Sequence, residues 1–176
     1  MSARVRVSGV SNRADTADYH QYIPDHGRSP YWDLLWMGLL HLPFMYAIMF
    51  SMVYSSQEVF HNLNTLYMAG MMVAPMLILM PLLMGGMYRH RMSNLIVYGG
   101  ASLLFVALFS FMRNQSFVDD KQFLRSMIPH HSGAVLMCEQ AKIQDSEVAN
   151  LCMQIIASQK AEIEQMRKIL GRISQQ

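Results

Sequence analysis

The sequence predicts an all-α protein in which three transmembrane helices are followed by an extramembrane helical hairpin. Two observations predict this fold class. No Asp, Glu, Lys or Arg occurs at 34–57, 59–88 or 92–112, and each window holds about twenty largely apolar residues, enough to cross a membrane. The C-terminal third is charged instead and shows a helical spacing of its apolar residues. A soluble bundle can imitate one such window, but hardly three in succession.

The chain divides into a polar tail, a membrane region, a linker, a hairpin and a short end: 1–30, 31–112, 113–118, 119–171 and 172–176. The N-terminal tail holds turn-forming residues and no early apolar region, so the first span should act as its own insertion signal. The membrane region should contain three spans, near 34–54, 66–88 and 95–112.

Two carboxylates mark the starts of the hairpin helices. Asp119, followed by Gln122, resembles an N-cap with a capping box and predicts a helix over 120–143. Asp145 predicts the start of a second helix, which should stop at Gly171. One face of that helix carries a seam of residues spaced by four and three: Cys152, Ile156, Gln159, Ile163, Met166 and Leu170. Two such helices enclose little core, so we expect a homo-oligomer or another partner to complete a four-helix bundle.

Basic residues near the spans predict the orientation in the membrane. The N-terminal tail and the second loop carry Arg4, Arg6, Arg13, Arg28, Arg89 and Arg91, whereas the first loop, "SSQEVFHNLN", carries none. We therefore expect a cell (inner) membrane protein with a cytoplasmic N-terminus and a periplasmic or extracellular hairpin. Arg113, Lys121 and Arg125 weigh mildly against this orientation. The net charge of +2 gives no reason to expect a nucleic-acid partner.

The stretch "MIPHHSGAVLMC" concentrates soft metal-binding side chains on the first hairpin helix. The candidate ligands of the hairpin are Met127, His130, His131, Met137, Cys138, Cys152, Met153 and Met166. Thioether, thiolate and imidazole together favour Cu(I) and suit Zn(II) less well. Adjacent histidines diverge by about 100° around a helix, so only one of the pair should face a given site. Pro129 lacks a backbone donor, which predicts a kink and a freed carbonyl.

A turn near 144–146 makes the two hairpin helices antiparallel. Cys138 should then lie level with Cys152, and Met127 should lie near Glu162. Two further interpretations stay open. Met and Cys are good fillers of an apolar core, and the two cysteines can form a disulfide, which would remove both as metal ligands. The paired histidines favour a site more than the sulfur residues do, because buried imidazoles need hydrogen-bond partners.

Two segments, "DDKQFLRSMIPHHSGAVLM" and "DSEVANLCMQIIASQKAEIEQMRKIL", resemble the domain of unknown function 305 family. The residues that match its pattern are Met127, Pro129, His130, His131, Met137, Gln159, Glu162, Ile163 and Met166. The spans and the "FMRNQS" linker are similar to membrane-anchored members. The resemblance implies a ferritin-like helical arrangement, hence a half-bundle completed by oligomerisation, and it implies copper binding. The two cysteines are not part of the pattern. The Glu-x-x-His motifs of di-iron bundles are absent, which argues against ferroxidase chemistry.

The predicted spans are rich in methionine, and 12 of the 18 methionines of the chain lie between Met37 and Met92. The candidate membrane ligands are His41 and Met45 on the first span and Met76 and Met80 on the second. An intramembrane histidine among thioethers suggests a relay for a soft monovalent metal. The same residues also suit a packing role, because Met fills gaps between helices and His can hydrogen-bond a neighbouring helix.

The motifs favour a metal-binding protein over an enzyme. No nucleophile–base pair, phosphate loop or dinucleotide fingerprint appears in the sequence, so we expect no enzymatic activity. The leading hypothesis is a membrane-anchored copper-handling protein that sequesters or transfers Cu(I) at the outer face of the membrane. The alternative is a metal-independent structural or oligomerisation module. A third, weaker hypothesis is a metal-conducting subunit lined by methionines.

Overall fold

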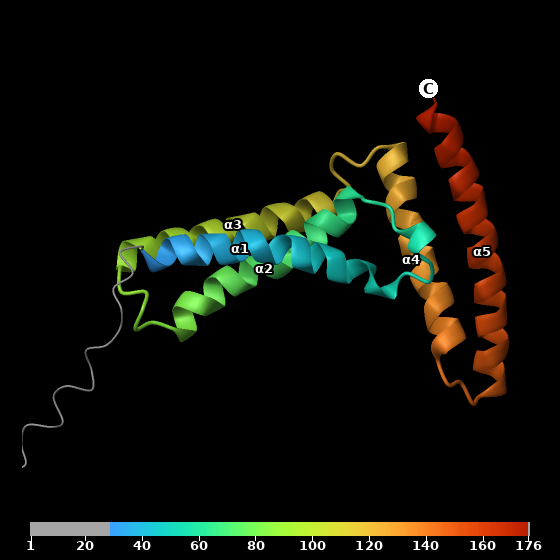
Figure 1. Cartoon of the computed structure of the whole chain (residues 1–176), viewed down its shortest axis with the longest axis horizontal. Coiled ribbons are helices and arrows are strands. Elements are labelled where there is room, and N and C mark those ends of the chain that lie inside the picture. The colour runs from blue at the N-terminus through green and yellow to red at the C-terminus, as the bar shows by residue number, and fades with distance from the viewer. Residues whose placement is uncertain (1–28, 176) are drawn as a thin grey trace, which may run out of the picture.

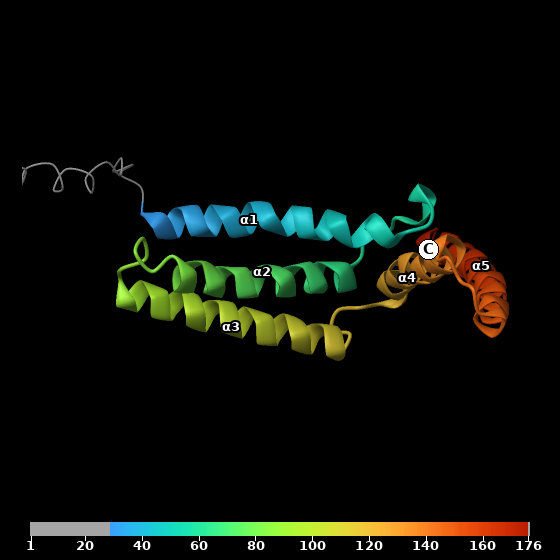
Figure 2. The same ribbon diagram turned by 90° about the horizontal axis from the view of Figure 1, so that it is seen from below.

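The computed structural model describes residues 29–175, and within that range the only regular secondary structure is helical. The helices are α1 (Pro30–Ile48), α2 (Leu63–Leu83), α3 (Arg91–Arg113), α4 (Asp120–Gln140) and α5 (Ser146–Ser174), with 3-10 turns η2 (Met49–Met52) and η3 (Ser56–Glu58). The helices α1, α2 and α3 lie side by side, and the hairpin of α4 and α5 crosses one end of them (Figures 1 and 2). The all-α prediction is confirmed. The predicted polar tail, 1–30, lies almost wholly outside the described residues.

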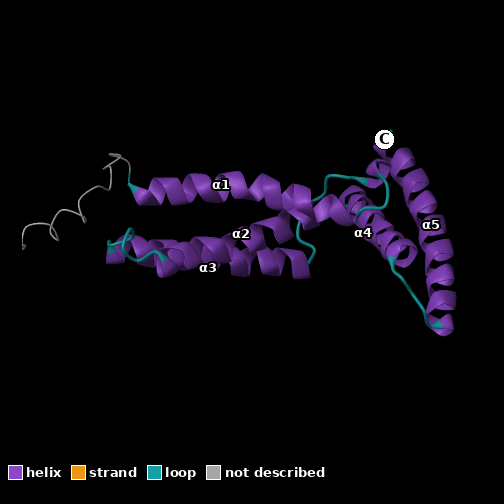
Figure 3. Cartoon of the chain, turned by 60° about the horizontal axis from the view of Figure 1, so that its bottom comes forward, coloured by secondary structure: helices purple, strands orange, loops and turns teal. Residues whose placement is uncertain are grey.

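Three helical segments are long and apolar enough to cross a membrane: Pro30–Met52, Leu63–Leu83 and Arg91–Arg113. The second ends five residues before the predicted residue 88, because the chain turns at 84–87, where the Met87 N–H donates to the Met84 carbonyl at 2.9 Å. Loops join the helices in sequence, and the one between α1 and α2 contains the turns η2 and η3 (Figure 3). The described part of the chain is therefore compatible with membrane association through three spans.

Small residues allow α2 to pack between α1 and α3 (Figure 2). Ala69, Gly70 and Ala74 are buried on α2. A Cβ atom at Gly70 would lie 2.5 Å from Leu108 Cδ1 on α3, and one at Gly38 on α1 would lie 3.0 Å from Leu77 Cδ2. Close backbone approach of this kind is the usual way in which membrane helices gain packing contacts.

A left-handed turn ends α3 and directs the chain into α4. Gln115 has a φ of 51°. The Ser116 N–H donates to the Phe111 carbonyl at 2.9 Å, and the Gln115 N–H donates to the Met112 carbonyl at 3.3 Å. These two bonds form a Schellman motif with glutamine at the position that glycine usually occupies. The predicted linker is thus an ordered turn.

The predicted N-caps are confirmed at both hairpin helices. Asp119 Oδ1 accepts from the Gln122 N–H at 2.7 Å, and Asp145 Oδ1 accepts from the Glu147 and Val148 N–H groups, each at 2.9 Å. The predicted stop at Gly171 is wrong, because α5 continues to Ser174. The extra turn packs Ile173 against the hairpin core, and Gly171 does not have a positive φ.

The hairpin core is covered partly by the loop between α1 and α2. Leu124 and Ile128 of α4 meet Ile163 and Leu170 of α5, and Phe60 of the loop packs against them. We predicted that a second subunit or another partner would complete this core. In the described residues the first loop supplies part of that cover, so the hairpin is docked onto the membrane region of its own chain.

A buried polar cluster fixes this docking. Ser132 is fully buried on α4; its Oγ accepts from the Tyr54 N–H at 2.7 Å and donates to Glu58 Oε2. Arg167 of α5 lies 3.5 Å from Glu58 Oε1, so the buried carboxylate has a cationic partner. We call Tyr54, Glu58, Ser132 and Arg167 the docking cluster. It joins the first loop to both hairpin helices.

Candidate functional site

A disulfide between Cys138 and Cys152 joins the two hairpin helices near their turn, with a Cα–Cα distance of 5.2 Å. The sequence left a disulfide and a thiolate metal site as alternatives. The structure adopts the disulfide, so neither cysteine offers a thiolate to a metal in this state. The predicted register is confirmed at this end of the hairpin.

His131 is more enclosed than its neighbour His130. Its side chain is 12 % exposed, and Nδ1 lies 3.0 Å from Oε2 of Glu162, whose side chain is 48 % exposed. The separation is that of an ion pair. Nδ1 is a buried nitrogen that makes no hydrogen bond among the described residues. Buried polar atoms in native proteins are usually satisfied, so such an atom calls for a physical explanation.

His131 and Glu162 contact each other across the two hairpin helices. Met127 precedes His131 by one helical turn, and Met166 follows Glu162 by one turn and packs against the hairpin core. The predicted proximity of Met127 to Glu162 stays a prediction. Glu162 is absent from the predicted ligands because a carboxylate is not a soft ligand.

The two histidines diverge as predicted. His130 is exposed, and its ring centroid lies 6.0 Å from that of His131 with the ring planes 61° apart. Met137 and Met153 are both exposed and accompany the disulfide at the other end of the hairpin. The predicted hairpin ligands thus fall into two groups. One surrounds His131, and the other is the exposed pair Met137 and Met153 near the turn.

Few side chains of the hairpin that could hold a metal lie close together. Among residues 29–175, no three His, Cys, Asp or Glu side chains are grouped as a metal site would require. Near the imidazole of His131 are the carboxylate of Glu162 and, one turn along each helix, the thioethers of Met127 and Met166.

The predicted membrane ligands are not gathered into one site. His41 lines a shallow hollow of about 420 Å³ to which only residues of α1 contribute. Met45, Met76 and Met80 are half-buried, whereas Met72 and Met84 of the α2 ladder are exposed. The ladder therefore passes from the helix interface to the outer face of the bundle. Within one described chain it does not form a continuous lined path.

A second charged pair joins the hairpin helices on their exposed side. Lys160 Nζ lies 2.7 Å from Glu139 Oε1 and 5.2 Å from the centre of the Tyr54 ring. The hydrogen bond from Lys160 lowers the pKa of Glu139, and the same bond raises the pKa of Lys160. This pair adds a surface link between α4, α5 and the first loop.

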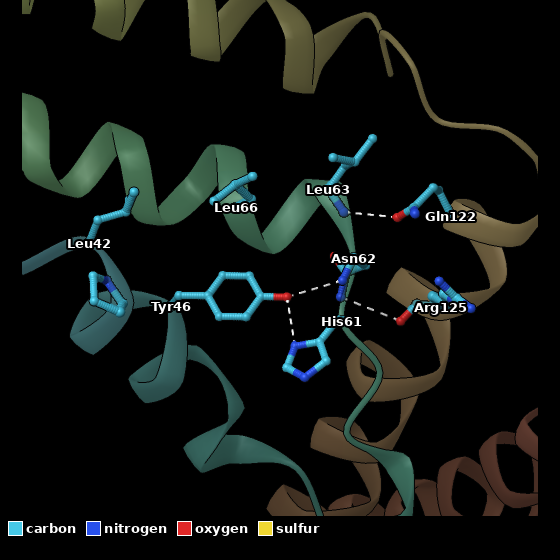
Figure 4. A pocket seen from close by; sticks show the side chains of 9 residues that line it. Leu42, Tyr46, His61, Asn62, Leu63, Leu66, Gln122 and Arg125 are labelled. Carbon is cyan, nitrogen blue, oxygen red and sulfur yellow. Dashed lines mark hydrogen bonds between the residues drawn. The ribbon is translucent and has the colours of Figure 1, made fainter. Parts of the chain in front are cut away.

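A pocket of about 470 Å³ lies where the membrane helices meet the hairpin (Figure 4). We call it the junction pocket. Its apolar wall comes from Leu42, Pro43, Leu63 and Leu66. Its polar lining comes from Tyr46, His61, Asn62, Gln122 and Arg125. The pocket was not predicted, because its lining residues are separated by up to 83 positions in the sequence.

The proline of "MIPHH" contributes to this pocket through the backbone. Pro129 has no N–H to donate to the carbonyl of Arg125 one turn earlier. Asn62 Nδ2 donates to that carbonyl instead, at 3.4 Å, as the dashed line in Figure 4 shows. The freed carbonyl predicted from Pro129 is thus confirmed, and it serves docking of the hairpin. The helix itself continues through Pro129.

The chain was compared with known proteins. The model of a family described as "Domain of unknown function (DUF305)" matches residues 110–175. The chain is 34% identical over 111 residues to "Uncharacterized protein L153" of Acanthamoeba polyphaga mimivirus, an alignment that covers 62% of this chain and 71% of that protein. That alignment is longer than the family match, so it extends into residues before 110. No solved structure matches the chain.

Proposed function

The chain belongs to the DUF305 family, and on that premise we propose that it is a membrane-anchored copper-handling protein that sequesters or transfers Cu(I). The observation that carries the proposal is Nδ1 of His131, an enclosed imidazole nitrogen that lies 3.0 Å from the Glu162 carboxylate and makes no hydrogen bond among the described residues. A bound metal ion would take this nitrogen as a ligand.

The side chains around His131 support a soft monovalent ion. Met127 and Met166 supply thioethers at the adjacent level of the hairpin, and thioether with imidazole is a donor set that selects Cu(I). The Glu162 carboxylate, 3.0 Å from Nδ1, supplies a negative charge that balances the bound cation. The exposed His130, Met137 and Met153 offer weaker sites at which copper is first captured or handed on.

The orientation we propose follows from the arginine distribution. Three crossings put the residues before α1 and the hairpin on opposite faces of the membrane, and the arginines before α1 and in the loop between α2 and α3 favour a cytoplasmic N-terminus. The hairpin then faces the periplasm or the cell exterior, where a disulfide persists. Copper would be handled at that outer face.

An anaerobic Cu(I) titration of the full chain in detergent, with a competing chelator, tests the proposal. We expect His131→Ala, or Met127→Leu combined with Met166→Leu, to abolish the tightest site. Glu162→Gln should weaken it about tenfold, as changes beside a metal ligand commonly do. His90→Ala is the matched control, because His90 is exposed on the loop at the far end of the bundle. Unchanged affinity and stoichiometry after His130→Ala, His131→Ala and Met127→Leu together would refute the hairpin site.

A metal-independent oligomerisation module is the second candidate, and one observation favours it. Met137, Val148, Leu151 and Met153 are exposed large apolar residues at the turn end of the hairpin. A second copy would bury this end. For this candidate, chelation leaves the oligomer mass measured by light scattering unchanged, while Leu151→Asp lowers it. A mass that depends on copper would instead favour the metal site.

A further inference from the structure

We propose that the junction pocket binds an anionic phospholipid, with the phosphate headgroup at Arg125 and an acyl chain against the apolar wall. The inference is independent of copper and concerns the contact between the hairpin and the membrane. Figure 4 shows the arrangement from close by: Tyr46 of α1, His61 and Asn62 of the first loop, and Gln122 and Arg125 of α4 converge there.

The acceptors that line the pocket each take part in a hydrogen bond within the protein. Gln122 Oε1 accepts from the Leu63 N–H at 3.0 Å, and the Arg125 carbonyl accepts from Asn62. The Tyr46 hydroxyl oxygen accepts from the Asn62 N–H at 3.2 Å and lies 3.1 Å from His61 Nδ1. The arrangement that satisfies every group has the Tyr46 O–H donating to Nδ1, which leaves the proton of a neutral His61 on Nε2.

The polar groups of the pocket lining that make no hydrogen bond within the protein are all donors. They are the guanidinium of Arg125, the amide nitrogen of Gln122 and Nε2 of His61. None has an acceptor within hydrogen-bond distance among the described residues. A ligand that only accepts hydrogen bonds and carries negative charge complements this lining, and phosphate does both.

Arg125 has no carboxylate partner among the described residues, unlike Arg167 and Lys160. Arg167 lies 3.5 Å from Glu58, and Lys160 lies 2.7 Å from Glu139. No carboxylate of the described residues lies within ion-pair distance of Arg125, although Arg125 is half-buried. A partly buried cation beside an apolar wall gains most from an anionic partner.

The placement of the pocket selects a lipid over free phosphate. Leu42 and Pro43 belong to α1, and Leu63 and Leu66 belong to the first turns of α2, so the apolar wall is formed by membrane helices. The donors belong to the first loop and to the hairpin helix α4 beside it (Figure 4). A ligand that spans both parts needs a polar head and an apolar chain.

Native mass spectrometry of the delipidated full chain in detergent tests this inference. The probes are phosphatidylglycerol and phosphatidylcholine with identical acyl chains, and inorganic phosphate. We expect one phosphatidylglycerol per chain, bound about tenfold more tightly than phosphatidylcholine, the factor that one charge-assisted contact supplies. Arg125→Gln should remove that preference, and Leu66→Trp should lower retention of both lipids by filling the wall.

The matched control is Arg113→Gln, since Arg113 is an exposed arginine at the same end of the bundle but outside the pocket. It should retain the wild-type preference, and circular dichroism should show unchanged helix content in every variant. Equal retention of the two lipids by the wild type, or an undiminished preference in Arg125→Gln, would overturn the inference. Inorganic phosphate binding as tightly as the anionic lipid would overturn the assignment to a lipid.

Discussion

Asn62 joins three parts of the molecule through one side chain and one backbone amide. Its Nδ2 donates to the Arg125 carbonyl that Pro129 leaves free, and its Oδ1 caps α2 by accepting from the Thr65 N–H at 2.8 Å. Its backbone N–H donates to Tyr46. Pro129 stands out in the sequence, but Asn62 does not, because 63 positions separate it from the carbonyl it binds.

Asn62→Ala should lower the free energy of unfolding by about 1–3 kcal/mol, because it removes an N-cap and leaves the partly buried Arg125 carbonyl without its donor. Thermal unfolding in detergent, followed by circular dichroism, measures the change. Asn114→Ala is the matched control, since the Asn114 side chain is exposed and makes no hydrogen bond within the described residues. Equal losses in the two variants would contradict this role for Asn62.

The role of the first loop could not be predicted from the sequence. The loop carries one charged residue, Glu58, and that carboxylate is buried against Ser132 and Arg167. Helix positions and N-caps follow from periodicity and local chemistry, so Asp119 and Asp145 were predicted. Contacts between residues 74 positions apart leave no periodic signal in the sequence, so the docking cluster was not predicted.

Ser132→Ala tests the docking of this loop on the hairpin. The change leaves the Tyr54 N–H and the Glu58 carboxylate without their shared partner, which should cost about 1–3 kcal/mol. Hydrogen exchange of the amides in the first loop should become faster than in the wild type. Ser158→Ala, on an exposed face of α5, should leave that exchange unchanged. Unaltered exchange in Ser132→Ala would show that the loop is held by other contacts.

The pair of Glu139 and Lys160 predicts a pH dependence of hairpin stability. The pKa of Glu139 is lowered, so its stabilising contribution is present above the ordinary value of 4.5 and is lost as the pH falls through the folded-state pKa. The pKa of Lys160 is raised, so its contribution is present below 10.5 and is lost as the pH rises through the folded-state pKa. The difference in melting temperature between the wild type and Glu139→Gln should be largest between these limits. This difference in melting temperature should be small, because the pair is exposed and screened by salt.

The whole molecule is a three-helix membrane region with a hairpin docked across one end, and this arrangement predicts a topology. The first loop and the hairpin contact each other, so they lie on one face of the membrane, while the turn between α2 and α3 lies at the far end (Figure 1). Single cysteines at Ser56 and at Ser174 should react with an impermeant maleimide from the same side, and one at Gly86 from the other. Labelling of Ser174 and Gly86 sites from one side would contradict the arrangement.

X-ray absorption at the copper edge of the Cu(I)-loaded full chain tests the proposal that the part of the hairpin around His131 holds Cu(I). With Cys138 and Cys152 joined in a disulfide, any sulfur bound to copper must come from methionine. We expect a first coordination shell that contains both imidazole nitrogen and sulfur. Imidazole scattering should be lost in His131→Ala, and the sulfur contribution in Met127→Leu combined with Met166→Leu. A shell that contains no sulfur, or that stays the same in both variants, would contradict the proposal.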